Sequence, residues 1–390
     1  MISVEAAMDA VLDLVTPLET EEIALRNANG RFLSQPVMAQ RSQPPFAASS
    51  MDGYALRRAE VEPDAMFKEV GEAAAGHGYT GTLRAGQAIR IFTGAPIPDG
   101  ADFVVIQEDV TRRGNLITLG HRIDDKDNIR PAGGDFTQGE ELTAPRILRP
   151  ADVALLAAMN VARVPVTRKP AIAILATGDE LVQPGESPGP DQIIASNSYG
   201  LAAMFEDAGA EVRMLPIARD TAASLKQAFA LARGADLIVT IGGASVGDHD
   251  LIAPVAAELG MEQAFYKVAM RPGKPLMAGK IGASAMIGLP GNPVSAMVCG
   301  AVFVLPMLRR MLGLQDVQAT LRDAPLGRGI GPNGPRAHYM RAQLRDGALY
   351  PDDRQDSSLL SVLAQADALM VRPPADPARN AGDIQQYILI

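Results

Sequence analysis

A glycine-rich loop near the middle of the chain has the composition of an anion-binding site. Gly242, Gly243 and Gly247 follow the apolar run at residues 237–241, which predicts a strand buried on both faces. Glycine lets the backbone approach a phosphate closely and direct successive N–H groups at it. Ser245 can donate one more hydrogen bond to the same anion. The loop therefore favours a phosphate nest, although an ordinary strand-to-helix turn has the same composition.

Acidic residues at the end of this loop add a second kind of chemistry. Asp248 and Asp250 precede residues 251–259, which are predicted to form a helix whose N-terminus contributes its positive dipole end. Each carboxylate is suited either to capping that helix or to holding a cation beside a bound phosphate. Both uses stay open on the loop alone.

Two other bends are expected to lie beside the glycine loop. Apolar strands at residues 171–176 and 285–289 run into polar bends at residues 177–180 and 290–292. Strands alternate with helices throughout this region, which is typical of right-handed βαβ units and a doubly wound parallel sheet. Such sheets bind ligands at the carboxyl ends of their strands. We therefore expect the three bends to form one pocket.

The longest apolar stretch follows the last of these bends. Asn292 is expected to be an N-cap and Pro293 the first helical residue. The run at residues 295–308 is interrupted by Gly300 and Pro306, so it is shorter than a membrane span and predicts a buried helix. The N-terminal residues lack the pattern of a signal peptide. We therefore expect a cytoplasmic protein without a membrane partner.

Ahead of this region, the composition indicates a small β-rich domain. Glycine and proline become frequent and the apolar segments shorten between residues 67 and 142. Thr93 is expected at a strand end, where its hydroxyl could face a site. Arg130 and Asp135 flank a glycine pair as an anion contact and a carboxylate ligand. Asp52, followed by glycine, reads by itself as a hairpin turn.

Composition excludes several classes of protein. The 390 residues suffice for two to four domains, and 47% hydrophobic with 21% charged residues indicates a folded globular protein. A net charge of -9 argues against general nucleic-acid binding, which needs clustered basic residues. The single cysteine, Cys299, excludes an intramolecular disulfide and is interpreted as a core residue. The four histidines show no ligand spacing, and His249 is interpreted as a solvated turn residue.

The C-terminal region predicts another β domain. Beyond residue 313 the long helical pattern ends, and residues 338–344 and 368–371 have the composition of strands. Arg336, Arg341 and the pair Ser357 and Ser358 could reach a neighbouring subunit or lie on the surface. The sequence favours the surface.

Seven motifs in order carry a family resemblance. They are Ser50-Met-Asp-Gly-Tyr-Ala55, Thr93-Gly-Ala-Pro96, Arg130 to Asp135, Thr177-Gly-Asp-Glu-Leu181, Gly242-Gly-Ala-Ser-Val-Gly247 with Asp250, Arg271-Pro-Gly-Lys-Pro275 and Leu289-Pro-Gly-Asn-Pro293. Together they resemble the molybdopterin molybdenumtransferase family, which includes the bacterial cofactor-biosynthesis enzyme and a domain of gephyrin. The motifs cover residues 43–295, and the flanking regions fit the length of the family.

The resemblance implies a multidomain fold of the α/β plus β class. A doubly wound, molybdopterin-binding-like αβ domain is expected at residues 169–317, with a β-rich insert domain at 43–139. The N-terminal linking domain comprises residues 1–42 and 140–168, and a small C-terminal β-barrel domain comprises residues 318–390. The resemblance further implies an elongated homodimer, with the site between the αβ domain of one subunit and parts of the other.

The resemblance also implies an activity and its partners. Molybdate is inserted at the dithiolene sulfurs of adenylylated molybdopterin, and AMP is released with the help of Mg²⁺. Transient contact with other cofactor-biosynthesis proteins is expected, and no contact with nucleic acid.

Functional residues carry over onto the matching positions. The resemblance assigns catalysis to Asp52, Thr93, Asp135 and Glu180, metal binding to Asp220 and Asp250, and substrate binding to Arg130, Ser196, Asn197, Gly242, Gly243, Ser245, Gly247, Arg271, Lys274, Pro275, Asn292, Ser295, Arg341 and Ser357. Elementary chemistry fits these roles, because Mg²⁺ takes one or two carboxylates together with phosphate oxygens and water. Arg271 and Lys274 supply two cations for the molybdate dianion.

Two rival functions stay open. The first is molybdopterin adenylyltransferase, since the αβ domain of that enzyme shares the glycine loop; the motifs outside residues 170–312 argue against it. The second is a non-catalytic dimeric scaffold, which the gephyrin resemblance permits. Carboxylates at all the expected positions argue against loss of catalysis.

Overall fold

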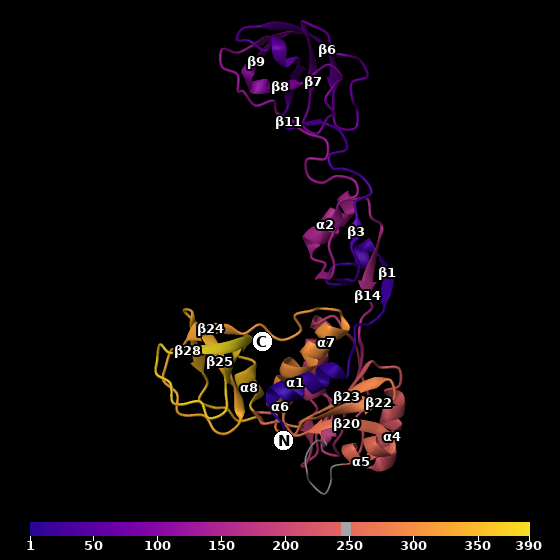
Figure 1. The fold of residues 1–390 in the computed structure, drawn as a ribbon, viewed down its shortest axis with the longest axis vertical. Coiled ribbons are helices and arrows are strands. Elements are labelled where there is room, and N and C mark those ends of the chain that lie inside the picture. Colours follow the sequence, from indigo (N-terminus) through magenta and orange to yellow (C-terminus); the bar gives the residue numbers. More distant parts are fainter. Residues whose placement is uncertain (243–250) are drawn as a thin grey trace. The chain divides into compact units, whose positions relative to one another are not determined.

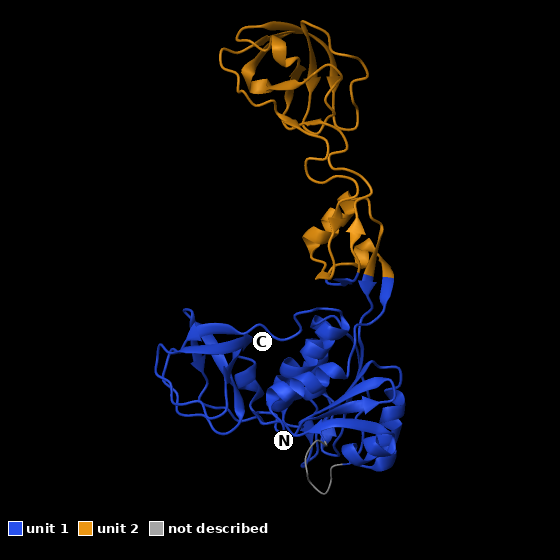
Figure 2. Cartoon of the chain, in the orientation of Figure 1, with its two compact units in different colours: residues 1–21, 30–34, 166–390 blue, residues 22–29, 35–165 orange. Residues whose placement is uncertain are grey.

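The computed structural model describes residues 1–242 and 251–390, which form two compact units. Unit 1 comprises Met1–Glu21, Gly30–Ser34 and Val166–Ile390, and unit 2 comprises Glu22–Asn29 and Gln35–Pro165 (Figure 2). The elements of both units are labelled in Figure 1. Each unit has its own hydrophobic core.

A six-stranded sheet forms the centre of unit 1. Its order is β18 (Glu211–Met214), β15 (Ala171–Ala176), β19 (Leu237–Ile241), β23 (Ser284–Leu289), β22 (Met277–Ile281) and β20 (Met261–Tyr266). The first four strands are parallel, as predicted. At the other edge β22 pairs antiparallel with β23, and β20 pairs antiparallel with β22. The expectation of a parallel sheet is therefore wrong at this edge. The reason is a tight hairpin between Ile281 and Ser284, in which Gly282 adopts a φ of 60°.

Two hydrophobic layers cover the sheet. Alternate residues of β15 point to opposite faces: Ile172 packs in one core cluster and Ala173 in the other. The elements of the first layer are α1 (Val4–Asp13), α3 (Asn197–Asp207) and α6 (Pro293–Cys299), and those of the second are α4 (Ala222–Leu231) and α5 (Ile252–Glu258). Figure 1 shows α4 and α5 together on one side of the sheet. The strand and helix pattern predicted for this region is confirmed.

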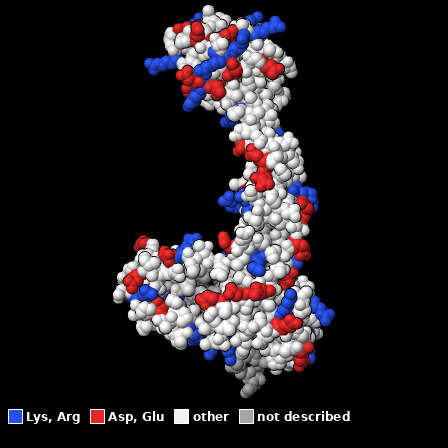
Figure 3. Space-filling view, in the orientation of Figure 1, with Lys and Arg blue, Asp and Glu red and all other residues white. Residues whose placement is uncertain are grey.

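The amphipathic helix α1 lies over this core. It buries Val4, Met8 and Val11, while Glu5 and Asp9 remain exposed on its outer face. Figure 3 shows a row of acidic side chains over this helix.

The apolar helix after β23 is longer than expected. Gly300 and Pro306 do not end it, because the helix continues through a π-helical stretch, Gly300–Val304, into α7 (Leu305–Met311). Pro306 lies in the first turn of α7, directly after this stretch. By length and composition the run Pro293–Met311 could cross a membrane, yet 78% of its most apolar window is buried inside the protein. The prediction of a buried helix is confirmed, and the prediction that the apolar run is shorter than a membrane span is wrong.

The C-terminal part of unit 1 is a small closed barrel. It contains β24 (Arg322–Pro325), β25 (Ala337–Arg345), β26 (Ala348–Pro351), β27 (Ala368–Arg372) and β28 (Ile384–Leu389). Adjacent strands pair in the order β26, β25, β27, β28 and β24, and a bridge between Leu326 and Leu349 joins the two ends. The strand β21 (Met270–Arg271) pairs with β25, and α8 (Leu360–Leu363) precedes β27. The predicted C-terminal barrel is confirmed.

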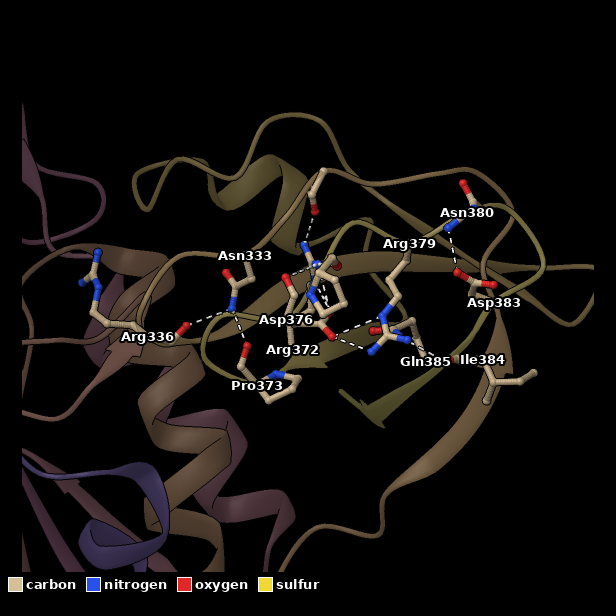
Figure 4. A network of polar contacts seen from close by, with 12 residues as sticks. Asn333, Arg336, Arg372, Pro373, Asp376, Arg379, Asn380, Asp383, Ile384 and Gln385 are labelled. Atoms are coloured by element: carbon tan, nitrogen blue, oxygen red, sulfur yellow. Dashed lines mark hydrogen bonds and ion pairs between the residues drawn. The ribbon is translucent and has the colours of Figure 1, made fainter.

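A buried ion network fixes the loop between β27 and β28 (Figure 4). Asp376 is 3% exposed and accepts hydrogen bonds from Arg372 at 2.9 Å and from Arg379 at 2.6 Å. Arg372 also donates to the carbonyl oxygens of Gly331 and Pro377. Burial alone would raise the pKa of Asp376, but the two guanidinium groups outweigh it and lower the pKa.

Unit 2 is built on a mixed sheet of six strands, in which parallel and antiparallel pairs both occur. Its order is β8 (Phe103–Ile106), β5 (Gly53–Leu56), β7 (Gln87–Ile91), β6 (Met66–Ala73), β10 (Leu116–Leu119) and β9 (Val110–Arg113). Shorter elements complete it: β3 (Val37–Met38), β4 (Ala48–Ser49), η3 (Gln107–Asp109), β11 (Ile129–Arg130), β12 (Glu141–Leu142), β13 (Arg146–Ile147) and α2 (Pro150–Ala158). The predicted β-rich character of this region is confirmed.

The hairpin interpretation of Asp52 is wrong. β5 begins at Gly53 and pairs with β7 and β8, whereas β4 before it pairs with β11. Glycine is required here for another reason: a Cβ at position 53 would lie 1.9 Å from the carbonyl oxygen of Val105.

We predict that Asp376→Asn loosens the C-terminal barrel, because it leaves the Arg372 charge buried and unpaired, at a cost of about 3 kcal/mol. Hydrogen exchange of residues 368–389 should be faster in this variant. The control is Asp353→Asn, which removes the exposed ion pair with Arg328 and should leave exchange unchanged.

The lowered pKa of Asp376 sets the pH dependence. Its contribution to stability is complete above the ordinary carboxyl value of 3.8 and is lost as the pH falls through the lower folded value. Exchange protection in the wild-type barrel should fall in that acidic range, and Asp376→Asn should lack this component. Equal acid sensitivity of the two proteins would contradict the assignment.

Candidate functional site

A cavity of about 630 Å³ lies at the carboxyl ends of the parallel strands in unit 1. Its polar lining residues are Thr177, Glu180, Ser196, Asn197, Ser198, Asp220, Asn292 and Ser358. Its remaining lining residues are Ala176, Gly178, Leu181, Ile193, Ile194, Ala195, Ile241, Gly242, Pro275, Pro290, Gly291 and Pro293. This position is the one expected for a ligand site in a doubly wound sheet.

The three predicted bends meet because their strands are paired in register. The N–H of Thr177 donates to Ile241, and the N–H of Gly242 donates to Leu289, so each bend starts beside the next strand's end. Gly242 has a φ of 86°, and a Cβ there would lie 3.1 Å from the Thr177 carbonyl oxygen. The predicted convergence is confirmed for the described residues. Gly243, Ser245, Gly247 and Asp250, as well as Asp248 and His249, lie outside them.

Glu180 reaches this cavity from the first bend. Its carboxylate folds back over Gly178, where a Cβ would lie 2.5 Å from a carboxylate oxygen. Gly178 has a φ of 151°, in the region that favours glycine. Within the described residues the Glu180 carboxylate accepts no hydrogen bond, so it is available to a ligand or a proton.

Asp220 is held in place by the same bend. The Thr177 hydroxyl donates to one oxygen of Asp220 at 2.7 Å, and Asp220 itself is exposed at the cavity. The other oxygen has no partner in the described part of the chain. This arrangement orients a carboxylate while leaving one oxygen free, as a metal ligand requires.

The donor set suits a hard cation held by few protein ligands. The described residues contain no group of three histidine, cysteine or acidic side chains that could hold a metal. Mg²⁺ needs only one or two carboxylates, with water and phosphate oxygens completing its octahedron. Asp220 with its free oxygen fits that requirement, whereas a cage made wholly of protein ligands is not formed by the described residues.

Amide and hydroxyl groups line the opposite wall. Asn197, the first residue of α3, donates its side-chain amide to the Gly291 carbonyl at 2.7 Å. This bond ties the start of α3 to the third bend. Asn292 precedes α6 as its N-cap, as predicted, but its side chain makes no capping hydrogen bond and is exposed. Within residues 1–242 and 251–390 the Asn292 amide has no hydrogen-bond partner, which leaves it open to a ligand.

The two cations expected to bind molybdate are exposed. Arg271 belongs to β21, and Lys274 follows it in the loop that ends at Pro275. Pro275 lines the cavity, whereas Arg271 and Lys274 are not among its lining residues. Ser295 is 4% exposed inside α6 and is also absent from the lining.

Arg341 corrects the expectation that the polar residues of the barrel lie on the surface. It is 2% exposed, since β25 points it into the protein. Its guanidinium donates to the Gln355 side chain and to the carbonyl oxygens of Arg354, Asp356 and Leu359. Four of its five N–H groups are thereby used to hold the loop that leads to α8.

That loop brings the barrel to the cavity. The N–H of Val294, in the first turn of α6, donates to the carbonyl of Ser357 at 3.0 Å. Ser358, and not Ser357, lines the cavity, and Asp356 accepts a hydrogen bond from its hydroxyl at 2.6 Å. The sequence analysis named both serines but assigned substrate binding to Ser357, the neighbour of the serine that lines the cavity.

Sequence reasoning also missed an apolar wall. Ile193 and Ile194, in the short strand β17 (Ile193–Ile194), are 59% and 38% exposed and line the cavity. β17 pairs in parallel with β16 (Leu181–Val182). The available signal in the sequence was a pair of isoleucines separated from Ser196 by one alanine. Exposed apolar residues at a cavity are typical of contact with an apolar ligand group.

Four of the predicted residues lie in unit 2, where two of them meet. One oxygen of Asp52 accepts hydrogen bonds from the Thr93 N–H and hydroxyl, each at 2.8 Å. These bonds, with a smaller effect of the Arg90 charge, lower the pKa of Asp52. Arg130 lies in β11 and Asp135 in the loop after it, and both are exposed.

Two other candidate groups are structural. Cys299 is fully buried, and burial raises the pKa of its thiol, which confirms it as a core residue and not a nucleophile. Burial and the charges of Arg271 and Arg372 lower the pKa of His338 to about 4, so this histidine is neutral near pH 7.

Comparison with known proteins covers nearly the whole chain. Residues 2–160 match the MoeA N-terminal region (domains I and II), residues 173–310 match a probable molybdopterin binding domain, and residues 323–390 match the MoeA C-terminal region (domain IV). A molybdopterin biosynthesis MoeA protein from Pyrococcus horikoshii has the same fold, with a TM-score of 0.84, 26% identity and full coverage of both chains.

Curated relatives are similar over comparable lengths. A molybdopterin molybdenumtransferase of Nostoc is 37% identical over 98% of this chain and 92% of its own. That of Bacillus subtilis is 32% identical over 100% of this chain and 94% of its own. With three consecutive domain matches and these identities, the chain belongs to the molybdopterin molybdenumtransferase family of molybdenum cofactor biosynthesis.

Proposed function

We propose that this chain inserts molybdate into adenylylated molybdopterin and releases AMP. The observation that carries the proposal is the cavity formed by the three bends, because it lies inside the domain that matches a probable molybdopterin binding domain. Its polar wall offers carboxylates and amides, and its other wall is apolar. Adenylylated molybdopterin is divided in a matching way, into a polar phosphate chain and a flat ring system.

Cleavage of a phosphoanhydride needs a positioned phosphate and neutralised charge. In our proposal the glycines that follow Gly242 bind the phosphate through backbone N–H groups. Gly242 donates its own N–H to Leu289, and its positive φ lets the backbone approach the phosphate closely. Asp220, oriented by Thr177, holds a Mg²⁺ ion together with Asp250. When bound, the metal supplies positive charge to the phosphate oxygens. Glu180 is available as a base or a further ligand.

The remaining wall residues bind the rest of the substrate. Ser196 and Asn292 offer side-chain hydrogen bonds, and Asn197 keeps the third bend in place through its bond to Gly291. Ile193 and Ile194 pack against a flat ring. These contacts position the substrate and exclude water from one of its faces.

Molybdate is the second substrate. It is a compact dianion, so the charges of Arg271 and Lys274 attract it, and Pro275 connects this loop to the cavity. Arg341 acts differently from the sequence expectation: its donors hold the loop carrying Ser357 and Ser358, which places one polar hydroxyl at the cavity.

The residues of unit 2 are assigned to the same reaction. Asp52, fixed by Thr93, and Asp135 supply carboxylates, and Arg130 supplies a cation for an anionic substrate. We further propose a homodimer whose site forms between the αβ domain of one subunit and parts of the other. The domain boundaries, a cytoplasmic location and transient contacts with other cofactor-biosynthesis proteins stay predictions of the sequence.

Separate observations disfavour the two rival functions. An adenylyltransferase needs only that domain, whereas residues 2–160 and 323–390 match MoeA regions as well. A scaffold needs no ordered carboxylates, whereas both Asp52 and Asp220 are oriented by threonine hydroxyls.

The direct test measures AMP release from adenylylated molybdopterin with Mg²⁺, with and without molybdate. We expect release to depend on molybdate. Formation of adenylylated pterin from molybdopterin and ATP by this chain alone would instead support the adenylyltransferase.

Asp52→Ala and Asp250→Ala should each abolish molybdate-dependent AMP release, because each removes a carboxylate assigned to the reaction. Circular dichroism and gel filtration should show the same fold and oligomeric state as wild type. Undiminished turnover in both variants would contradict the roles assigned to these carboxylates, whereas a wild-type chain that releases no AMP would point to the scaffold.

Thr177→Val should weaken Mg²⁺ binding about 10-fold, since it removes the hydroxyl that orients Asp220. Isothermal titration of Mg²⁺ into the full chain checks this directly. Thr177→Ser keeps the hydroxyl and is the matched control, expected to bind like wild type. Equal Mg²⁺ affinities of the valine and serine variants would contradict the role assigned to the Thr177 hydroxyl.

A further inference from the structure

Arg90, in β7 of unit 2, is bound on several sides beside Asp52. Its guanidinium donates to the Gly53 carbonyl at 3.2 Å and to the Gln107 side chain at 2.6 Å. It also lies over two aromatic rings, with its central carbon 5.0 Å from the Tyr54 centroid and 4.9 Å from that of Phe92. An arginine restrained by two rings and two acceptors has little freedom to move.

These contacts surround the backbone on both sides of Asp52 and Thr93. Gly53 directly follows Asp52, and Phe92 directly precedes Thr93. The N–H of Gln107 donates to the Asp52 carbonyl at 3.0 Å. Gln107 therefore accepts a hydrogen bond from Arg90 with its side chain and holds the Asp52 backbone with its N–H. Arg90 therefore connects the three segments that determine where the Asp52 carboxylate lies.

The Asp52 carboxylate is presented with one oxygen occupied and one open. Both hydrogen bonds from Thr93 go to the same oxygen, and within the described residues the other oxygen has no partner. An open, ionised oxygen is the form in which a carboxylate accepts a hydrogen bond or a proton from a substrate.

We propose that Arg90 is a positioning residue, which fixes the Asp52 and Thr93 pair so that the open carboxylate oxygen is directed at the substrate. The inference rests on the proposed function and adds a residue to its machinery. Arg90 touches no reacting atom and acts only through Asp52 and Thr93.

The electrostatic environment of Asp52 agrees with this role. Of the charged side chains described around it, the Arg90 guanidinium from β7 is the one that lowers the pKa of the Asp52 carboxyl, after the larger effect of the Thr93 hydrogen bonds. From η3, Glu108 accepts a hydrogen bond from the Gln107 side chain. Loss of the Arg90 charge should therefore raise the pKa of Asp52.

The test compares Arg90→Gln and Arg90→Lys in the full chain. Arg90→Gln should lower kcat for molybdate-dependent AMP release by about 10- to 100-fold with KM within about 2-fold of wild type, because the carboxylate is displaced while substrate binding elsewhere is kept. Arg90→Lys keeps the charge but loses the fork and should lower kcat too. The control, Arg84→Gln, changes an exposed arginine of the same sheet unit and should match wild type.

A second readout does not depend on turnover. Titration of the Asp52 carboxyl by ¹³C NMR, assigned by its absence in Asp52→Asn, should show a higher midpoint in Arg90→Gln than in wild type and a smaller change in Arg90→Lys. Because Arg90→Lys keeps the charge, a midpoint closer to wild type in this variant separates the effect of the Arg90 charge from a general loss of local structure. An unchanged midpoint, or a wild-type kcat in folded Arg90→Gln, would overturn the inference.

The two possible failures can be told apart. If the wild-type chain releases no AMP with molybdate, the proposed function fails, while the titration still decides whether Arg90 controls Asp52. If wild type is active and both readouts of Arg90→Gln equal those of wild type, only the inference about Arg90 fails.

Discussion

In-register parallel pairing of β15, β19 and β23 is the constraint on which the site depends. Ala176 lies opposite Ile241, and Ile241 opposite Leu289, so the three strands end at one level. Each strand is almost fully buried, and a slip by one residue would exchange the side chains that pack in the two hydrophobic layers, such as Ile172 and Ala173. The hydrophobic layers therefore fix the position of the bends to within one residue, and polar groups distant in sequence meet at one cavity.

The sequence predicted this part of the molecule well for a physical reason. Alternating apolar strands and helices leave few topologies open, and ligand sites of such sheets lie at one edge. Glu180, Gly242 and Asn292 could thus be placed together before any coordinates. The antiparallel edge was not predicted, because β20 and β22 contain glycine, lysine and glutamate in patterns without a clear alternation. Gly300 and Pro306 were misjudged since a π-helical stretch has no local sequence signal.

The barrel residues show what sequence patterns cannot contain. Arg341 looked like a surface residue because arginine is seldom buried. Its burial depends on carbonyl oxygens between 13 and 18 positions away, all of which turn toward it only in the folded loop. The same loop binds α6 through Ser357 and places Ser358 at the cavity. Side-chain choices of this kind follow from tertiary contacts, whereas the existence of a barrel follows from strand composition.

An NMR titration of the full chain with AMP tests most directly whether the three bends form one phosphate-binding site. A single site requires that the backbone amides of Thr177, Gly242 and Gly291 shift together and yield one dissociation constant. Shifts confined to a single bend, or to another region such as the C-terminal barrel, would contradict it.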